Sequence, residues 1–236
     1  MRDDKGRTPL HCAALSSSSI PVVDFLLNEA GPSNSKGAAA AVRMVDHNGN
    51  LPLHCAAASS GVSAKDVMER LLSAPSSHST MAATDMTNHD GSTPLHVACR
   101  GSGSDGFNVP VIRFLLKVNP SATAVQDREG YTPLHLVALR SRKPRAVNAI
   151  RSLTYNGRSD LCKLADRRKG NTPLHTALVS VSTQQQPQQQ QNQDANQIAF
   201  AHVIRTLVQI LPKTGSIRNA AGETPVHIAC ERLLSP

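Results

Sequence analysis

The chain has 236 residues, a formal net charge of +8, and 39% hydrophobic residues that include no Trp, two Tyr and four Phe. This length exceeds the usual single-domain size of roughly 100 to 150 residues, so we expect one large domain or one elongated array. No uncharged apolar run reaches about 18 residues, which argues against a membrane-spanning helix. Five Cys and an N terminus without a secretory signal favour a reducing compartment, so we expect a cytoplasmic protein and leave a nuclear location open.

One nine-residue phrase recurs six times along the chain. Its copies are GRTPLHCAA from Gly6, GNLPLHCAA from Gly49, GSTPLHVAC from Gly91, GYTPLHLVA from Gly130, GNTPLHTAL from Gly170 and GETPVHIAC from Gly222. Successive copies are 39 to 52 residues apart. Self-similarity at such spacing indicates an array of equivalent structural units.

Each copy predicts a tight turn followed by a short helix. Asp or Asn stands three residues before the Gly in five copies, and this pattern favours a turn in which Gly takes positive φ; these residues are Asp3, Asp46, Asn88, Asp127 and Asn219. Thr then acts as the N-cap, and Pro fills the first helical position, where its missing N–H costs nothing. Leu51 replaces the Thr in the second copy, and Arg167 replaces the Asx in the fifth, so the local geometry of those two turns stays open.

A second amphipathic segment follows each of the first five predicted helices. Its apolar residues at helical spacing are Val22, Val23, Leu26 and Leu27; Val67, Met68, Leu71 and Leu72; Val111, Ile112, Leu115 and Leu116; Val147, Ile150 and Leu153; and Val203, Ile204, Leu207 and Leu211. One such helix pair cannot bury its own apolar face. Neighbouring units must therefore stack and share a core.

The sequence resembles the ankyrin repeat, whose signature Asp-x-x-Gly-x-Thr-Pro-Leu-His-x-Ala-Ala is matched nearly in full by residues 3–14. The resemblance covers almost the whole chain and implies an all-α solenoid of stacked helix-turn-helix units with short β-hairpin-like turns. We expect a single array over residues 1–236, with repeats at about 3–45, 46–87, 88–126, 127–166 and 167–218 and a truncated repeat at 219–236. Because neither end carries a polar capping repeat, we expect a fragment of a longer chain.

Every repeat exceeds the family's usual length of about 33 residues, so each carries an insertion. The insertions between paired helices are placed at 102–108, 141–145 and 182–196, and those after the second helix at 31–40 and 75–84. The Gln-rich stretch at 182–197 cannot bury enough apolar surface to order itself and is predicted to be disordered. Self-association of this tract is the alternative.

The histidines of the phrase are unsuited to a metal centre. They are His11, His54, His96, His135, His175 and His227. Equivalent positions in neighbouring repeats lie about 8 to 10 Å apart, whereas two ligands of one zinc ion each lie about 2 Å from it. The resemblance implies instead that these imidazoles hydrogen-bond within and between repeats.

Nothing in the sequence indicates a reaction centre. Four Cys of the phrase, Cys12, Cys55, Cys99 and Cys230, are predicted to be small packed residues. Cys162 lies outside the phrase and has no CxxC partner. Because nucleotide-binding, zinc-protease and serine-hydrolase motifs are missing, we predict no enzyme activity and no catalytic, metal or cofactor site.

The resemblance places partner contacts on the concave side, at the turn tips and the exposed ends of the first helices. The matching positions are Lys5, Arg7, His47, Asn48, His89, Asp90, Arg100, Arg128, Glu129, Tyr131, Arg140, Arg168 and Lys169. From the third to the fifth repeat this predicted face becomes basic, and Tyr131 lies in its middle. Arg and Tyr are enriched in binding hot spots, so we predict a monomeric, non-catalytic scaffold that binds an acidic segment of another protein. A solvated surface without a partner is the alternative.

Two further interpretations stay open. The run containing Arg140, Arg142 and Arg145 also fits a nuclear import signal or a nucleic-acid contact. Only Tyr131 and Tyr155 flank this run, too few for a platform on which bases stack. A solvated insertion is therefore the favoured interpretation of the run, ahead of an import signal or a nucleic-acid contact. The array also fits a module of a larger enzyme, channel or nuclear regulatory protein.

Overall fold

The computed structural model describes residues 2–16, 20–29, 35–74, 80–101, 106–142, 145–155, 159–180, 193–210 and 214–234. Within these ranges all regular secondary structure is helical, which confirms the predicted all-α class. No helix of this described part has the length and hydropathy to cross a bilayer. The chain divides into unit 1, formed by Met1–Ser104 and Pro110–Ala122, and unit 2, formed by Asp105–Val109 and Thr123–Pro236.

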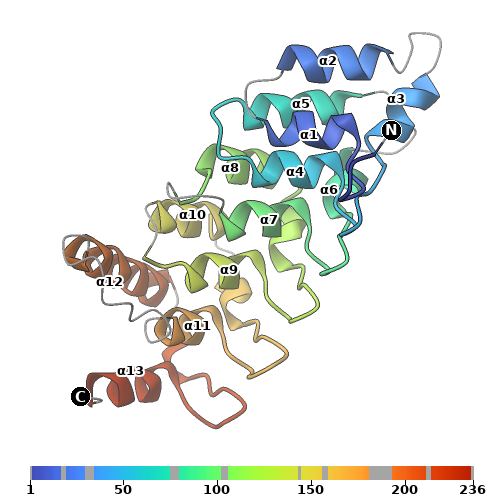
Figure 1. Cartoon of the computed structure of the whole chain (residues 1–236). Helices are drawn as coiled ribbons and strands as arrows, with labels where there is room; N and C mark the ends of the chain where they lie inside the picture. The colour runs from blue at the N-terminus through green and yellow to red at the C-terminus, as the bar shows by residue number, and fades with distance from the viewer. Residues whose placement is uncertain are drawn as a thin grey trace. The chain divides into compact units, whose positions relative to one another are not determined.

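Unit 1 is a stack of helix pairs (Figure 1). Its helices are α1 (Pro9–Leu15), α2 (Ile20–Glu29), α3 (Ser35–Ala41), α4 (Pro52–Ala58), α5 (Ala64–Ser73), α6 (Thr80–Asp85), α7 (Pro94–Arg100) and, apart from its first residue, α8 (Val109–Val118). Helix α4 packs between α1 and α7, while α2 and α5 pack against each other in a second layer. Each first helix therefore lies beside the equivalent helix of the next repeat.

Unit 2 repeats this arrangement. Its helices are α9 (Pro133–Leu139), α10 (Ala146–Leu153), α11 (Pro173–Val179), α12 (Gln193–Ile210) and α13 (Pro225–Leu234), with short 3₁₀ helices η2 (Ser159–Lys163) and η4 (Thr214–Ser216). Helix α11 packs between α9 and α13, and α10 packs against α12. A further 3₁₀ helix, η1 (Pro120–Ala124), crosses the boundary of the two units.

The predicted turn and helix starts are confirmed. Every first helix begins at the Pro of its phrase, and Thr8, for example, precedes Pro9 in an extended conformation with φ −82° and ψ 164°. The Gly of each phrase has positive φ, from 64° at Gly170 to 85° at Gly130. Because L-residues rarely adopt this region, the turn fixes where each helix can start.

The stacked helices bury part of the aliphatic residues that the helical period selected, while a further set is half-buried: Leu26, Leu27, Leu72, Leu116, Val147 and Ile204. Val23, Met68 and Ile112 are fully buried, as are Ile150 and Leu207 in unit 2. Val22 departs from the prediction because it is 49% exposed on the outer side of α2. The helical period thus located the buried stripe but also included residues at its half-buried and exposed edges.

Two predicted insertions contain helices that were not predicted from the sequence. Helix α3 contains residues 35–40, and α6 contains residues 80–84. Ala-rich composition explains α3, since Ala has the highest helix propensity. Beside α6, the buried Asn119 side chain donates a hydrogen bond to Thr84 Oγ1 at 3.1 Å. These segments are therefore parts of the fold.

The Gln-rich insertion is described only at its end. Residues 182–192 lie outside the described residues, whereas 193–197 form the first turn of α12 and are helical rather than disordered. Parts of the other predicted insertions, at 31–34, 75–79, 102–105 and 143–144, also lie outside the described residues.

Candidate protein-binding surface

The histidines of the phrase connect successive repeats. The Thr8 backbone N–H donates to His11 Nδ1 at 3.2 Å, so Nδ1 is an acceptor and the proton of the neutral ring lies on Nε2. Nε2 then donates to the carbonyl oxygen of Asn50, in the next repeat, at 2.9 Å. The corresponding bonds to the next repeat are His54 to Ser92 at 3.0 Å, His135 to Asn171 at 3.0 Å and His175 to Glu223 at 3.1 Å.

This geometry requires neutral imidazoles. A proton on Nδ1 would face the backbone N–H that now donates to it, and burial also disfavours the charged ring. Burial lowers the pKa of His54 to about 4, and it lowers the pKa of His175 as well. These rings therefore hold the scaffold together. Within the described residues no three metal-binding side chains come together.

The turns adopt the predicted β-hairpin-like form. In the first turn Asp3 N–H donates to the Arg7 carbonyl at 3.0 Å, and Gly6 N–H donates to the Asp3 carbonyl at 2.8 Å. One further backbone bond joins each turn tip to the next in the same unit. These bonds are His47 to Lys5 at 3.0 Å, His89 to Asn48 at 2.9 Å, Arg167 to Glu129 at 2.9 Å and Ala220 to Lys169 at 2.8 Å. The spacing of the tips is thus fixed by the backbone.

An Asx side chain anchors each turn, including the fifth. Asp127 Oδ1 accepts from the backbone N–H groups of Glu129 at 3.0 Å and Tyr131 at 2.8 Å. In the fifth turn Asp166 accepts from Arg168 at 2.9 Å and from Lys169 at 2.7 Å. The anchoring residue is therefore Asp166, one position before Arg167. The turn is one residue longer than the others, and the fifth repeat begins at 166 and not at 167.

The turn that lacks a Thr keeps the common geometry. Leu51 N–H donates to His54 Nδ1 at 3.1 Å, and α4 begins at Pro52 as expected. The Leu51 side chain is 2% exposed, so it packs into the core where a Thr hydroxyl would otherwise bond the imidazole. Apolar burial replaces the capping contact at this position.

Close contact between tips explains the glycines. A Cβ on Gly6 would lie 2.3 Å from the His47 ring, and a Cβ on Gly49 would lie 2.6 Å from the His89 ring. In unit 2 a Cβ on Gly130 would lie 2.4 Å from the Arg167 backbone nitrogen. His47 and His89, predicted as binding residues, therefore also cover the preceding turn.

Most of the predicted binding residues lie at the surface. Those that are exposed are Lys5, His47, Asn48, His89, Asp90, Arg128, Arg140, Arg168 and Lys169. Those that are half-buried are Arg7, Arg100, Glu129 and Tyr131. The role of these residues in binding stays a prediction.

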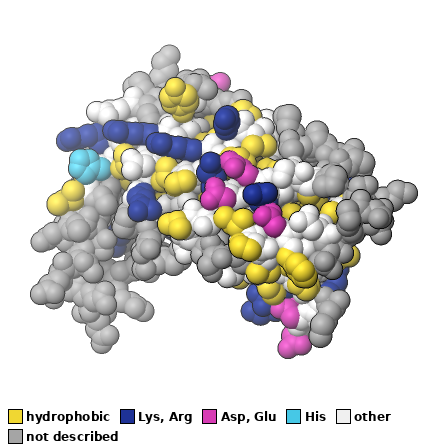
Figure 2. All heavy atoms as spheres, turned by 90° about the horizontal axis from the view of Figure 1, so that it is seen from above, with side chains coloured by type: hydrophobic (Ala, Val, Ile, Leu, Met, Phe, Trp, Pro, Cys, Tyr) yellow, Lys and Arg dark blue, Asp and Glu magenta, His cyan; other side chains and the backbone are white. Residues whose placement is uncertain are grey.

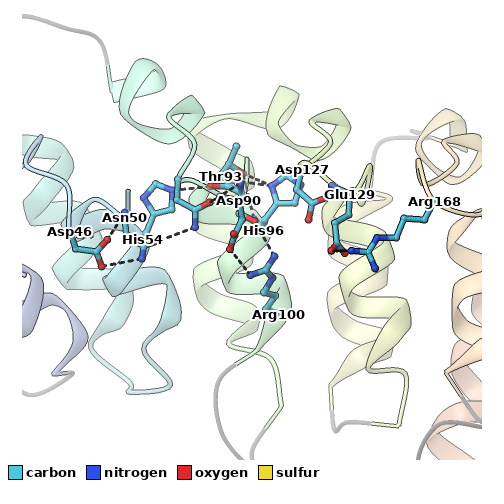
Figure 3. Close-up of polar contacts among 12 residues, drawn as sticks. Asp46, Asn50, His54, Asp90, Thr93, His96, Arg100, Asp127, Glu129 and Arg168 are labelled. Atoms are coloured by element: carbon cyan, nitrogen blue, oxygen red, sulfur yellow. Dashed lines mark hydrogen bonds and ion pairs between the residues drawn. The ribbon is translucent and has the colours of Figure 1, made fainter. Parts of the chain in front are cut away.

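Several of these cations already have acidic partners. Arg7 pairs with Asp3 at 2.8 Å. Arg100 reaches back to Asp90 at 3.5 Å and also donates to Ser92 Oγ at 3.3 Å (Figure 3). Figure 2 shows one face on which Lys and Arg side chains lie next to Asp and Glu side chains. The predicted basic face is therefore partly neutralised.

In unit 2 an ion pair joins two repeats. Arg168, at the tip of the fifth turn, donates to Glu129 Oε1, at the tip of the fourth turn (Figure 3). This contact was not predicted, because the two residues are 39 positions apart and only the stacking of the turns brings them together.

Tyr131 lies half-buried beside these charges. Its ring centroid is 5.8 Å from that of His135, with an angle of 47° between the rings. Burial raises the pKa of the phenol, and the nearby carboxylates of Asp166 and Glu129 raise it further. Tyr131 is therefore a neutral aromatic side chain that lies against His135 of α9 and close to the tip of the fifth turn.

The side chain directly before the Asx residue joins its own turn to the residue that precedes the next turn, a contact that was not predicted. Arg2 Nη1 donates to the carbonyls of Gly6 at 2.9 Å and Val45 at 2.6 Å. Gln126 Nε2 donates in the same way to Gly130 and Ala165, each at 2.9 Å. In the sequence, the signal for this contact is a long side chain with N–H donors, Arg or Gln, directly before the Asx residue.

The cysteines fall into two classes. Cys55, Cys99 and Cys162 are buried, and burial raises the pKa of Cys55 and Cys162 to about 12. Cys12 and Cys230 are exposed, so the prediction that they are packed was wrong. Cys12 follows the buried His11, and successive helical residues point in different directions.

Comparison with known proteins agrees with this architecture. A family model described as ankyrin repeats (three copies) matches residues 1–82 and 57–158. The chain belongs to the ankyrin-repeat family. Ankyrin repeats are a general protein–protein interaction module.

The array is similar to the solved structure titled "Crystal Structure of EF0377 an Ankyrin Repeat Protein", with 18% identity, coverage of 95% of this chain and 91% of that chain, and a TM-score of 0.59. At this identity the likeness shows the fold alone. The comparison with curated proteins gives no match.

Proposed function

We propose that this ankyrin-repeat chain is a non-catalytic scaffold whose unit 2 binds an acidic segment of a partner protein. The proposed surface consists of the fourth and fifth turn tips and α9, and its residues are Arg128, Glu129, Tyr131, Arg140, Arg168 and Lys169. Tyr131 is the anchor, and the cations around it receive the partner's carboxylates.

The distribution of charge on the two tips is the observation that carries this proposal. Asp127 and Asp166 are buried, and their carboxylates bond the turn backbone. Arg128, Arg168 and Lys169 are exposed at the same tips. These two carboxylates therefore serve the fold, whereas Arg128, Arg168 and Lys169 face solvent and attract an anionic partner.

The setting of Tyr131 suits an anchor. Its contact with the His135 ring and its partial burial restrict the side chain before any partner binds. A pre-ordered aromatic side chain loses little entropy on binding and offers a large apolar area beside its hydroxyl. Arg140, at the C-terminal end of α9, extends the surface by roughly 10 Å along that helix.

The buried thiols support the absence of catalysis in this proposal. A pKa of about 12 keeps Cys55 and Cys162 protonated, and a protonated thiol is a poor nucleophile. The phrase histidines are committed to bonds between repeats, which leaves them poorly suited to proton transfer.

The proposal is tested with the full chain and a fluorescein-labelled Glu-rich peptide, read by fluorescence anisotropy. We expect Tyr131→Ala to weaken binding about ten-fold, as the loss of a hot-spot aromatic does. Tyr155→Ala is the matched control, because Tyr155 is 75% exposed in the same unit but follows α10, away from the turn tips. A peptide with Gln in place of Glu should bind weakly. Equal affinities of wild type and Tyr131→Ala would refute the proposed anchor.

A further inference from the structure

The ion pair between Glu129 and Arg168 lies inside the surface proposed for the acidic partner. The Arg167 N–H bond to the Glu129 carbonyl, at 2.9 Å, holds the two tips side by side. The side chains remain accessible, since that of Arg168 is 66% exposed and that of Glu129 is 44% exposed. An incoming carboxylate can therefore reach the same guanidinium.

Glu129 differs from the other acidic residues of these tips. In the turns at 127–131 and 166–171 the remaining acidic residues are Asp127 and Asp166, which are buried and bonded to backbone N–H groups. Glu129 instead directs its carboxylate at a surface Arg of the neighbouring repeat. Its carboxylate therefore occupies the position that a partner's Asp or Glu would take on Arg168.

We propose that Glu129 is an internal competitor that holds Arg168 until an acidic segment displaces it. This inference rests on the proposed function of the same surface. A guanidinium binds one carboxylate best in a paired, fork-like geometry, so the ligand and Glu129 compete for Arg168. A segment with closely spaced carboxylates can engage Arg128 and Lys169 as well and so gains enough to displace Glu129. A segment with an isolated carboxylate gains less, and the surface therefore selects for high negative charge density.

The strength of the pair suits such a role. Ion pairs between exposed side chains are weak, because water screens them and ordering two long side chains is unfavourable. Glu129 therefore lowers the affinity without closing the site. In unit 1 the pair between Asp90 and Arg100 offers a comparison, since Asp90 can be neutralised there without touching unit 2.

The test is a double-mutant cycle in the full chain with the fluorescein-labelled Glu-rich peptide. We expect Glu129→Gln to bind the peptide roughly two- to five-fold more tightly than wild type, with a smaller gain at high salt. The control Asp90→Asn removes one negative charge from unit 1 and should leave the affinity unchanged. In an Arg168→Gln background, Glu129→Gln should give no gain, because the guanidinium that it releases is absent.

The outcomes separate this inference from the function on which it rests. A wild-type chain that binds the peptide through Tyr131, with no gain from Glu129→Gln, would overturn the inference alone. A gain that persists in the Arg168→Gln background would also overturn it, since Glu129 would then act only through its overall charge. If neither wild type nor Glu129→Gln binds the peptide, the proposed function and this inference both fail.

Discussion

The turn tips of unit 1 and unit 2 have the same backbone and different surfaces. In unit 1 the second and third tips expose His47, Asn48, His89 and the acidic Asp90, and Asp3 pairs with Arg7 in the first turn. In unit 2 the fourth and fifth tips expose Arg128, Arg167, Arg168 and Lys169. The hydrogen bonds that build the turns are nevertheless the same. The residues that build the turn and the residues that set its surface charge thus occupy different positions of the repeat.

Different residues cover the turn glycines in the two units. The residue after the Asx covers the glycine of the preceding turn, and in unit 1 this residue is His47 or His89. In unit 2 Arg167 covers Gly130 and Ala220 lies over Gly170. Because the covering contact uses the backbone as well as the side chain, the position tolerates change in charge. This tolerance lets unit 2 present a basic surface on an unchanged framework.

A common interior predicts the same pH response in both units, and this is the largest effect that we expect. His54 in unit 1 has a pKa of about 4, and the pKa of His175 in unit 2 is also lowered. Between about pH 6.5 and pH 4 the unfolded chain binds protons that the folded chain excludes, so the free energy of unfolding falls as the pH drops through this window. For His54 alone the loss is about 3 kcal/mol. Urea unfolding at pH 7 and at pH 4 measures it.

The variant His54→Gln is the control for this pH response. It removes one titrating ring, so its free energy of unfolding should depend less steeply on pH than that of wild type. An NMR titration in which His54 and His175 gain their protons near pH 6.5 would contradict the shared interior.

The covered glycines provide the second test. Gly49→Ala in unit 1 and Gly130→Ala in unit 2 should each destabilise the chain by about 2 to 3 kcal/mol, because the new Cβ adds a collision to the strain of positive φ. Gly222 has φ +79° with no atom within 4 Å of an added Cβ. Gly222→Ala should therefore cost only about 1 kcal/mol. Equal losses of stability in all three variants would show that the tips are not in close contact.

The longer fifth turn sharpens the comparison within unit 2. Asp166→Ala should destabilise the chain by about 2 kcal/mol, because the backbone N–H groups of Arg168 and Lys169 lose a charged acceptor. Arg167→Lys, which keeps the backbone contacts and the charge, should change the stability by less than about 0.5 kcal/mol. Thermal unfolding of both variants decides whether Asp166 or position 167 anchors this turn.

The surface ion pairs should matter least for stability. Arg100→Gln in unit 1 and Arg168→Gln in unit 2 should each lower the free energy of unfolding by less than about 1 kcal/mol, since both pairs are solvent-accessible. Only Arg168→Gln should weaken binding of the Glu-rich peptide. A loss of peptide binding in Arg100→Gln would remove the distinction between the two units.

Local signals in the sequence predicted the recurring parts of the fold. Asx, Gly, Thr and Pro at fixed offsets located each turn and helix start, because these residues act on backbone angles and caps within a few positions. The fifth turn was predicted wrongly. The position three residues before Gly170 is Arg167, whereas the Asx residue that anchors this turn is the adjacent Asp166. Helices α3 and α6 were missed because their Ala- and Thr-containing segments lack the apolar period that identified the other helices.

The sequence by itself determined that the chain is built of repeated turn-and-helix-pair units, because the controlling residues lie within one repeat and act locally. It also placed the turn tips at the surface, although it misjudged the exposure of Val22, Cys12 and Cys230. Only the tertiary structure decided which charges remain available there, because the pairing of Glu129 with Arg168 and of each histidine with the next repeat joins residues about one repeat apart. Such contacts depend on how the turns stack in space, and a pattern within one repeat does not predict which residues of the next repeat lie beside it.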